Sequence, residues 1–574
     1  MNTHAETASR APRRTFVLGL GAAAVLWGVS AACRAAWTCD DAYIVFRYAR
    51  NLVNGVGLVF NAGERVEGFT NFFWVLWTAP AFALGIDPET WTNAWGVACF
   101  GATLALLAWD HARLRSCLPS PAWAAIPVAA LAAAAHGDLV AFATSGLETS
   151  LFTFLLVSGY VLLVGPLPPS RALLAGAVFG LATLTRPDGA LPAAIGGAFV
   201  LLRMRRVASA AAYTGGFLSL VLPLEAFRLA YYGSLVPNTY WAKSANVAWW
   251  DQGLRYLQLY GEKYGVLTFG PVLLLMAWLR WRTEGSPRRE TLASAWLPRV
   301  LLALALASGY TLYVVRVGGD FMYARMLLPA TPFYLILFEL GWTALPSRTP
   351  AALALVVAAL PVVVPPLVPR PVTGTRRESG VANEWEYYSL KRNAETDFRS
   401  EILRRFFDGL PVRVLVYGSE VRLAYRARIP TVVEAHGLTD PLIARQPIVQ
   451  RGRPGHEKWP PPPYVVDVRK VHVAFQALGF ETSRFPAYIP VVPIRFGLVG
   501  GFLLHWDPAM LDAWRRRGAV FEDFPSWLDG YLARMSSLSD ERLRNDYEKF
   551  RHFYFQHVAD PARERPFRAR LGLP

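Results

Sequence analysis

Charged residues are scarce in this chain of 574 residues. Only 17% of its side chains are Asp, Glu, Lys or Arg, whereas 53% are hydrophobic. Ordinary soluble domains carry roughly a quarter charged residues, so this composition excludes a purely soluble protein. Apolar stretches of about 20 residues, the length that crosses a bilayer core, recur through the first 370 residues and then stop.

Cysteine and phosphate-binding loops are also lacking. The chain has four cysteines, at positions 33, 39, 99 and 117, without metal-ligand spacing, and none in its last 200 residues. No glycine-rich loop of the GxGxxG or Walker type is present. These absences argue against a cysteine metal site and against a nucleotide-phosphate loop.

The net charge of +16 does not indicate nucleic-acid binding, because the arginine clusters lie between apolar segments. Basic residues beside membrane spans mark cytoplasmic loops. The sequence therefore predicts a polytopic membrane module at residues 1–370, a flexible linker at 371–400 and a soluble external domain at 401–574, periplasmic if the cell has an outer membrane.

A first, uncleaved span is predicted at residues 15–36, since a signal peptide usually has an apolar core of only about 7–15 residues. The other predicted spans are 70–84, 92–109, 121–136, 147–165, 171–185, 189–202, 208–230, 264–280, 298–316, 327–343 and 351–369. The loop after the first span and the tail can both be external only if one segment between 70 and 200 is broken or re-entrant. The sequence does not decide which; the run Arg186-Pro187-Asp188-Gly189 is one candidate.

The most informative motif is the acidic pair Asp40-Asp41, directly after the first span. A carboxylate pair at the mouth of a membrane helix costs desolvation and self-repulsion, so it favours proton or cation chemistry at the bilayer surface. A wet loop is the alternative. Residues 43–52 then suit an amphipathic helix at the headgroup level.

Polar side chains gather at several other predicted span ends. Each group alone is typical of a loop cap or an anchor, but together carboxylates with Arg and Lys could hold a sugar hydroxyl and a lipid phosphate. These candidates are Asn71, Glu148, Arg186, Asp188, Asn238, Lys243, Asp320 and Arg325.

The tail predicts a small α/β domain. Residues 412–418 and 431–434 read as buried strands, and 507–574 as amphipathic helices in which Leu511, Trp514, Phe524, Trp527 and Leu528 pack. His436 and His456 lack metal-ligand spacing and are interpreted as loop residues.

Several of these elements together resemble a known family, the terminal arabinofuranosyltransferases of cell-wall arabinan assembly and their uncharacterised relatives. They include Asp-Asp-Ala-Tyr-Ile-x-Phe-Arg-Tyr-Ala from Asp40, Ser-Gly-Leu-Glu-Thr ending at Thr149, Thr-Arg-Pro-Asp-Gly from Thr185, Leu-Val-Pro-Asn-Thr ending at Thr239, and Gly-Gly-Asp-Phe-Met from Gly318. In the tail, Gly437 to Asp440 and Gly455 to Lys458 add to the likeness. These enzymes are similar in plan to the GT-C superfamily, so the expected fold class is a multispan α-helical membrane protein, GT-C-like, with a C-terminal soluble α/β domain.

The resemblance implies roles for individual residues. One aspartate of the pair would be the catalytic base of an inverting transfer; Asp40 is favoured, with Asp41 second, and Glu148 would orient the acceptor. Arg47, Lys243 and Arg325 would neutralise the phosphate of the donor. Asn71, Arg186, Asp188, Asn238 and Asp320 would bind substrate. A divalent metal held by Asp40 and Glu148 is left open.

The expected activity is transfer of a monosaccharide, such as arabinofuranose, from a polyprenyl-phosphate donor to an envelope glycan or glycolipid, in the inner membrane of a bacterium and on its external face. No nucleic-acid partner is expected. The alternatives are a non-enzymatic motility or assembly factor, since a related branch is named as a flagellar motor control protein, and a transporter. A transporter would be expected to show inverted repeats and midspan charges, which the sequence lacks.

Overall fold

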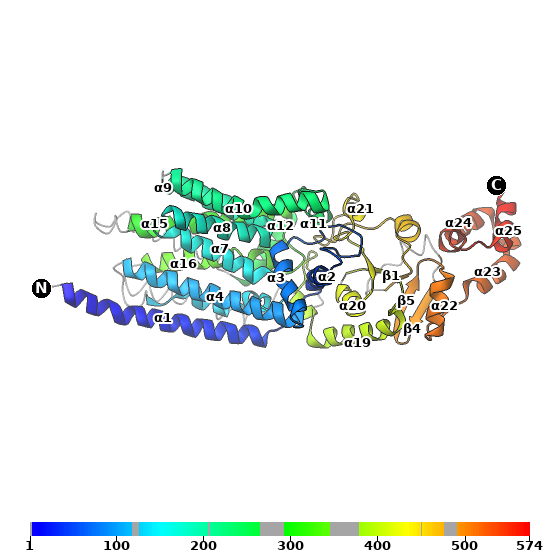
Figure 1. Cartoon of the computed structure of the whole chain (residues 1–574), viewed down its shortest axis with the longest axis horizontal. Coiled ribbons are helices and arrows are strands. Elements are labelled where there is room, and N and C mark those ends of the chain that lie inside the picture. Colours follow the sequence, from blue (N-terminus) through cyan, green and yellow to red (C-terminus); the bar gives the residue numbers. More distant parts are fainter. Residues whose placement is uncertain are drawn as a thin grey trace.

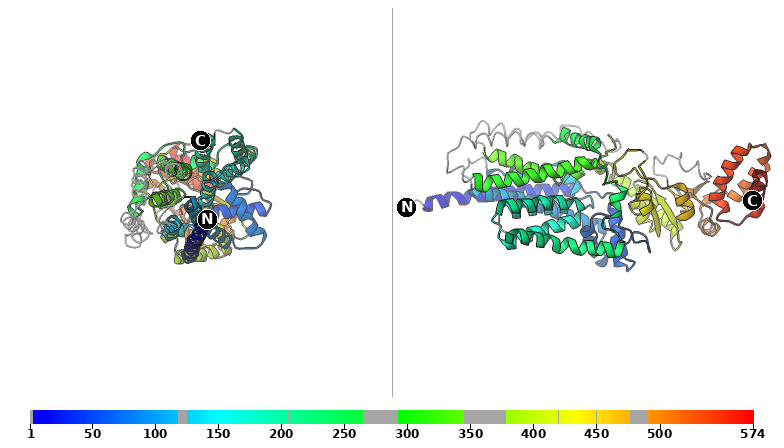
Figure 2. Two further views of the ribbon diagram at one scale, coloured as in Figure 1. Left: turned by 90° about the vertical axis from the view of Figure 1, so that its left-hand side faces the viewer. Right: turned by 90° about the horizontal axis from the view of Figure 1, so that it is seen from above.

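The structure is a computed structural model that describes residues 3–117, 125–204, 207–264, 292–344, 378–418, 420–448, 450–475, 490 and 492–574. A bundle of long helices forms one end of an elongated molecule, and the tail extends from the other end of that bundle (Figure 1). The views in Figure 2 confirm that the N-terminus and the C-terminus lie at opposite ends. The expected fold class, a helical membrane protein with a sheet in its C-terminal region, is confirmed.

The bundle consists of helices that run roughly along the long axis. They are α1 (Thr3–Arg34), α4 (Pro88–Cys117), α7 (Thr149–Val164), α8 (Pro169–Thr185), α9 (Ala190–Met204), α10 (Val207–Tyr232), α15 (Leu297–Val317) and α16 (Thr331–Ala344). Four segments in the described residues are long and apolar enough to cross a membrane: Thr15–Arg34, Pro88–Ser116, Val207–Tyr232 and Ser294–Val317. The chain is therefore a multi-pass membrane protein. The expected spans at 264–280 and 351–369 lie outside the described residues.

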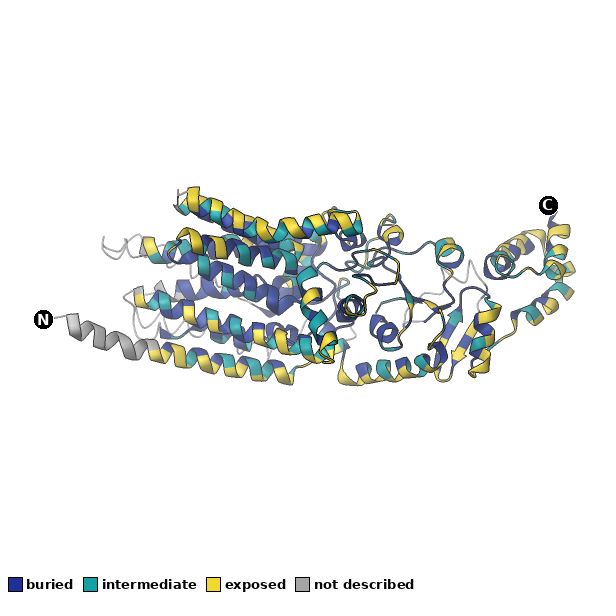
Figure 3. Cartoon of the chain, in the orientation of Figure 1, coloured by how far each residue is buried: buried dark blue, intermediate teal, exposed yellow. Residues whose placement is uncertain are grey.

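The outer helices expose apolar side chains, whereas α7 is buried among its neighbours (Figure 3). Leu26 on α1 is 72% exposed, Leu202 on α9 is 83% exposed and Leu222 on α10 is 57% exposed. Isolated exposed leucines are common on soluble proteins, but exposed leucines on several outer helices of one bundle form a surface that suits lipid.

Small residues permit a close helix contact between α8 and α10. A Cβ atom on Gly176 would lie 1.9 Å from the carbonyl oxygen of Tyr213, and one on Gly216 would lie 2.1 Å from that of Leu173. Any larger residue at either position would push the two backbones apart, since membrane helices pack closely only where small residues meet.

The segment predicted as a span at 70–84 does not cross. It forms α3 (Phe72–Ala83), only 12 residues long, and both of its ends lie on the side of the tail. Asn71, which precedes it, binds Glu148, and Glu89, which follows it, binds Arg422 of the tail. This re-entrant helix resolves the parity problem between residues 70 and 200.

Two further segments between residues 70 and 200 differ from a simple span, the predicted span 121–136 and the run at Arg186. Residues within the predicted span 121–136 form α5 (Val128–Ala135), which is followed after His136 by the short α6 (Gly137–Phe142). The run at Arg186 is a tight turn between α8 and α9 rather than a broken helix, with Pro187–Gly189 forming one 3₁₀ turn.

The loops at the tail-facing end carry further helices. They are α2 (Ala42–Val53), α11 (Asn238–Ala242) and α12 (Trp250–Lys263). The helix α2 was expected at the headgroup level, but Tyr43, Phe46 and Tyr48 are fully buried. Tyr425 of the tail packs on Tyr43 and Phe46, so α2 is enclosed between the tail and the bundle.

The tail contains a six-stranded mixed sheet in the order β2-β1-β3-β5-β4-β6. Its strands are β1 (Arg413–Val416), β2 (Thr431–Glu434), β3 (Val473–Ala474), β4 (Val492–Phe496), β5 (Val499–Leu503) and β6 (Val520–Phe521). The strand β1 pairs in parallel with β2 and β3, and the remaining pairs are antiparallel. Both predicted strands are confirmed as β1 and β2.

Helices surround this sheet and extend beyond it. They are α18 (Glu384–Tyr387), α19 (Leu390–Phe407), α20 (Val421–Arg426), α21 (Pro441–Ala444), α22 (Pro508–Arg516), α23 (Phe524–Ala533), α24 (Asp540–Phe550) and α25 (Pro561–Leu571). Trp514 is fully buried among Phe407, Phe496 and His472, so the predicted amphipathic helices do pack through their aromatic residues. The stretch expected to be a flexible linker to residue 400 is helical from Leu390, because Leu403, Phe406 and Phe407 of α19 join the core. The exact domain boundaries stay a prediction.

Candidate functional site

Asp40, in the first loop, is hydrogen-bonded to the tail. Its carboxylate accepts hydrogen bonds from the backbone N–H groups of Val421, at 3.1 Å, and Arg422, at 2.8 Å. These groups open α20, whose own N-cap residue supplies no side-chain cap, so Asp40 caps that helix from a distant part of the chain. Its side chain is 3% exposed, and burial raises the pKa of the carboxyl to about 7 although the two N–H groups oppose the rise.

Asp41 has a different environment from its neighbour. It is half-buried, and no described residue donates a hydrogen bond to its carboxylate. Burial raises the pKa of Asp41 above its usual range, while the positive charges of Lys243 and Arg325 lower it in part. Its carboxylate is therefore basic, available and close to cations, which reverses the order of preference within the pair.

Glu148, the residue before α7, is the centre of a buried polar network. It accepts hydrogen bonds from Asn71 at 2.8 Å, from Arg186 at 3.1 Å and from Arg325 at 3.4 Å. Within the described residues, Asn71 Oδ1, Thr149 Oγ1 and Arg325 Nε are buried next to it without a hydrogen-bond partner. Buried polar atoms are nearly always paired in folded proteins, so these three atoms have unused hydrogen-bonding capacity.

Arg186 and Asp188 reach the network because α8 ends there. Arg186 precedes a proline, which disfavours helical geometry for it, and it is extended with φ −154°. Its guanidinium group binds Asp188 at 3.0 Å, and Asp188 also accepts a hydrogen bond from Tyr310 of α15. The turn thus presents one cation and one carboxylate at the end of the bundle.

Asp320 and Arg325 are placed by the loop after α15. Gly318 and Gly319 have φ values of +91° and +73°, which only glycine adopts freely, and they reverse the chain. Ala324 has φ +64°, a strained value for a residue with a side chain. This loop brings Arg325 within 3.4 Å of both Asp320 and Glu148.

Lys243 approaches the site from the turn after α11. It is exposed, forms no ion pair with any described residue, and exerts its charge on Asp41. Its methylene groups lie against Gly455 of the tail, where a Cβ atom would be 3.5 Å from Lys243 Cγ.

Two residues predicted to bind donor phosphate or substrate, Arg47 and Asn238, form hydrogen bonds to the tail. The guanidinium group of Arg47, 2% exposed, donates hydrogen bonds to the carbonyl groups of Phe60, Ile429 and Pro430 and to Asn61. Asn238 donates to the carbonyl groups of Gly437 and Leu438. The guanidinium donors of Arg47 are thus used by backbone carbonyl groups and by Asn61, and its expected phosphate-binding role stays a prediction.

The tail supplies charged residues that the sequence reading missed. Arg453 lies over the ring of Phe321, binds Glu384 at 2.6 Å and acts electrostatically on Asp41. Glu434, at the end of β2, is also in electrostatic range of Asp41, and burial raises its pKa to about 7. The signals that could have found them were the motif from Gly455 to Lys458, two residues after Arg453, and the motif from Gly437 to Asp440, three residues after Glu434.

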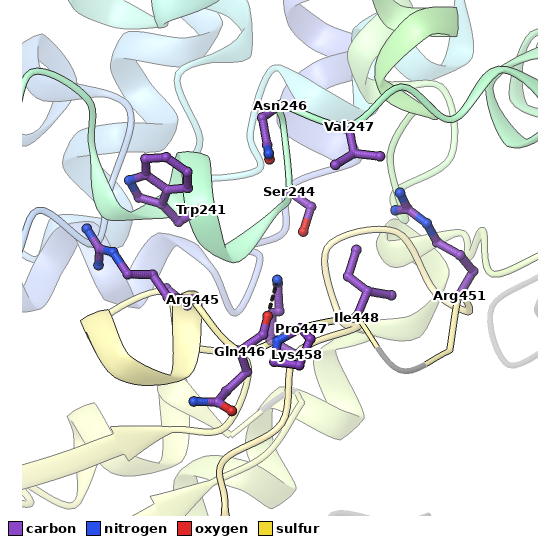
Figure 4. A pocket seen from close by; sticks show the side chains of 11 residues that line it. Trp241, Ser244, Asn246, Val247, Arg445, Gln446, Pro447, Ile448, Arg451 and Lys458 are labelled. Carbon is purple, nitrogen blue, oxygen red and sulfur yellow. Dashed lines mark hydrogen bonds between the residues drawn. The ribbon is translucent and has the colours of Figure 1, made fainter.

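Beside this site, a groove of about 700 Å³ separates the loop after α11 from residues 444–458 of the tail. In Figure 4, Trp241, Ser244 and Asn246 line one side, and Gln446 and Lys458 line the other. Arg445 and Arg451 flank it, and both lie over tryptophan rings, Trp241 and Trp249 respectively. Trp241 and Ser244, which line the groove, flank Lys243, whose charge lowers the pKa of Asp41.

The suggested metal pair does not fit. Asp40 uses its carboxylate on two backbone N–H groups, and Glu148 is enclosed by two guanidinium groups that would repel a cation. In the tail, His472, His505 and Asp507 lie close enough to share an ion. However, His472 Nδ1 accepts the N–H of Arg413, so the proton of a neutral His472 is on Nε2, facing Asp507. His472, His505 and Asp507 are therefore interpreted as a hydrogen-bonded cluster and not as a metal site.

Comparison with known proteins supports the family resemblance. The chain is 33% identical over 365 residues to the terminal β-(1→2)-arabinofuranosyltransferase of Mycobacterium tuberculosis, covering 57% of this chain and 56% of that protein. It is 34% identical over 341 residues to the protein of the same name from Corynebacterium glutamicum, covering 53% and 48%. The chain thus spans about half the length of the curated relatives it matches. No family model matches it.

Two solved structures resemble the fold more distantly. ArnT from Cupriavidus metallidurans bound to undecaprenyl phosphate aligns with a TM-score of 0.48 at 13% identity, covering 73% of this chain and 85% of ArnT. The apo oligosaccharyltransferase of Archaeoglobus fulgidus aligns with a TM-score of 0.46 at 11% identity, covering 86% and 75%. The resemblance to the terminal arabinofuranosyltransferases, expected from the motifs, is confirmed by the sequence relatives.

Proposed function

We propose that this chain is a membrane glycosyltransferase that moves a monosaccharide from a polyprenyl-phosphate donor to a cell-envelope glycan by an inverting reaction. The observation that carries the proposal is the Asp41 carboxylate at the tail-facing end of a membrane bundle, to which no described residue donates a hydrogen bond and whose pKa the charges of Lys243 and Arg325 lower. The names of the sequence relatives make arabinofuranose the sugar to test first.

In this reaction Asp41 is the general base. Its carboxylate takes the proton from the acceptor hydroxyl as that oxygen attacks the anomeric carbon, and the bond from the anomeric carbon to the phosphate oxygen breaks. The leaving polyprenyl phosphate gains negative charge, so Lys243 and Arg325 stabilise the transition state more than the ground state. Asp40 holds Asp41 in place by fixing the tail against the first loop.

The polar network around Glu148 binds the sugar. Asn71 Oδ1 accepts a hydrogen bond from a sugar hydroxyl, Arg325 Nε donates one, and Arg186 with Asp188 keeps Glu148 oriented. The groove beside Trp241 receives the acceptor chain, because an aromatic ring with Ser244, Asn246 and Gln446 around it suits a polyhydroxylated ligand. The reacting side is the membrane face that carries the tail, proposed to be the periplasmic face of a bacterial inner membrane.

The test is transfer by the purified full-length protein in detergent. The expected result is addition of one pentose to an arabinan oligosaccharide, detected by mass spectrometry, with polyprenyl-phosphate arabinofuranose as donor and no turnover with a nucleotide sugar. Transfer from a nucleotide sugar without any polyprenyl lipid would overturn the proposal. Absence of transfer from every polyprenyl-phosphate sugar tested would favour the non-enzymatic or transport alternatives.

A further inference from the structure

Three arginines meet at the end of the bundle farthest from the tail. Arg113 is near the end of α4, Arg171 is near the start of α8 and Arg203 is near the end of α9. Arg113 and Arg171 lie at Gly165, the residue that follows α7, and Arg203 is in electrostatic range of Arg171. A Cβ atom on Gly165 would lie 2.7 Å from both terminal nitrogens of Arg171 and 2.9 Å from one of Arg113, so these two guanidinium groups are close neighbours.

Part of this arrangement has a structural explanation. Arg171 donates to the carbonyl group of Val161 at 2.9 Å, and Arg203 donates to that of Leu163 at 2.7 Å. Both carbonyl groups belong to the last turn of α7, where cations offset the negative end of the helix dipole. Arg113 makes no such contact, and one helix end supplies only about half a negative charge for three cations.

One carboxylate, that of Asp110, acts electrostatically on Arg171, but it does not neutralise the positive charge of the three arginines. Asp110 lies near Arg171, but it is paired with Arg299 at 2.9 Å. Among the residues that the structure describes, no carboxylate forms an ion pair with Arg113, Arg171 or Arg203. In addition, Arg113 Nη1 and Arg171 Nε are buried without a hydrogen-bond partner. Unpaired buried donors are costly and adjacent guanidinium groups repel each other, so an anion bound between them would stabilise the cluster.

The surroundings of the cluster suit a lipid better than a free ion. The ring of Trp109, 39% exposed, lies under Arg113 at 4.6 Å, and Phe199 lies near Arg203 at 5.7 Å. Leu202, beside Arg203, is 83% exposed. Aromatic rings with exposed leucines beside basic residues form the boundary between headgroups and acyl chains, and basic pockets between helices bind anionic headgroups.

We propose that Arg113, Arg171 and Arg203 bind the phosphate group of an anionic phospholipid in the leaflet opposite the Asp41 site. The bound phosphate bridges the end of α4, the start of α8 and the end of α9. The helices α8 and α9 form a hairpin whose turn carries Arg186 and Asp188. The lipid, bound at one membrane face, therefore stabilises the α8–α9 hairpin, whose turn carries Arg186 and Asp188 at the opposite face.

The experiment measures lipid binding and needs no enzymatic activity. The full-length protein in a mild detergent is mixed with phosphatidylglycerol, phosphatidylcholine or inorganic phosphate, and thermal unfolding and native mass spectrometry are recorded. Phosphatidylglycerol is expected to raise the melting temperature and to form retained adducts, whereas phosphatidylcholine is not. In the double variant Arg113→Gln/Arg171→Gln, binding is expected to weaken roughly tenfold or more, since each arginine beside an anionic headgroup contributes about a factor of five to ten.

Arg34→Gln is the matched control, because Arg34 is an exposed arginine at the opposite end of the bundle and bonds only Ser30 of its own helix. It is expected to bind phosphatidylglycerol like the unaltered protein. If the double variant does not fold, the single variant Arg203→Gln is used, with a smaller loss expected. Equal adducts in control and variant, equal stabilisation by phosphatidylcholine, or full stabilisation by inorganic phosphate alone would each overturn the proposal.

Discussion

The substitution Asp41→Asn is the sharpest test of which aspartate of the first loop is the general base. Asparagine has nearly the same size but cannot take a proton from an acceptor hydroxyl. Loss of a general base typically slows a reaction about a hundred- to ten-thousand-fold, so kcat is expected to fall by that factor. Folding is expected to be unaffected, because no described residue donates a hydrogen bond to the Asp41 carboxylate.

Asp40→Asn is the matched comparison and is expected to behave in the opposite way. The Asp40 carboxylate accepts two backbone N–H groups with its two oxygens, whereas an asparagine has one oxygen and turns an N–H₂ group toward the second donor. A buried donor left unpaired costs about 1–3 kcal/mol. The melting temperature of the variant is therefore expected to drop, with kcat reduced less than Asp41→Asn reduces it.

The assay is single-turnover transfer from a polyprenyl-phosphate sugar, with thermal unfolding measured on the same samples. For the unaltered protein, kcat/KM is expected to rise with pH through a pKa above the usual range of an aspartate, because Asp41 must be ionised to act. If Asp41→Asn retained activity within threefold while Asp40→Asn abolished it at an unchanged melting temperature, Asp40 would be the base and the reasoning from hydrogen bonding would be refuted.

Four further predictions follow from the same contacts. Arg325→Gln is expected to raise KM for the donor at least tenfold and to leave KM for the acceptor within threefold; equal changes would indicate a general disruption around Glu148. Trp241→Ala is expected to raise KM for the acceptor severalfold and to spare the donor, as measured by varying each substrate in turn. Burial raises the folded-state pKa of Asp40 to about 7 from the ordinary 3.8, so its contribution to the free energy of unfolding is full below about pH 4 and decreases as pH rises through 7; melting curves of Asp40→Asn should lack this slope. A cysteine at Ser537, exposed on the tail, should react with an impermeant reagent in intact cells; labelling only after lysis would place the tail inside.

Much of the fold follows from local sequence. Apolar length predicts the long helices, and the apolar run that ends at Gly418 and the β-branched residues of 431–434 predict the strands β1 and β2. The re-entrant α3 was not predicted, because its 12 residues are as apolar as a true span; only the contacts of Asn71 and Glu89 show that both ends lie on one side. The buried position of α2 also depended on Tyr425, which is far along the chain.

The sequence alone determined that this is a multi-pass membrane protein with a soluble α/β tail, and which polar residues stand at span ends, because composition and periodicity are local properties. It also determined the family likeness, because that likeness is carried by short runs of residues. Only the tertiary structure decided which of these residues act together. Asp40 and Asp41 are adjacent in sequence, yet one carboxylate caps a helix 380 residues away and the other stays available. The physical reason is that the basicity of a carboxylate depends on its hydrogen-bond donors, its burial and the charges near it, and in this protein those come from the tail, from α11 and from the loop after α15.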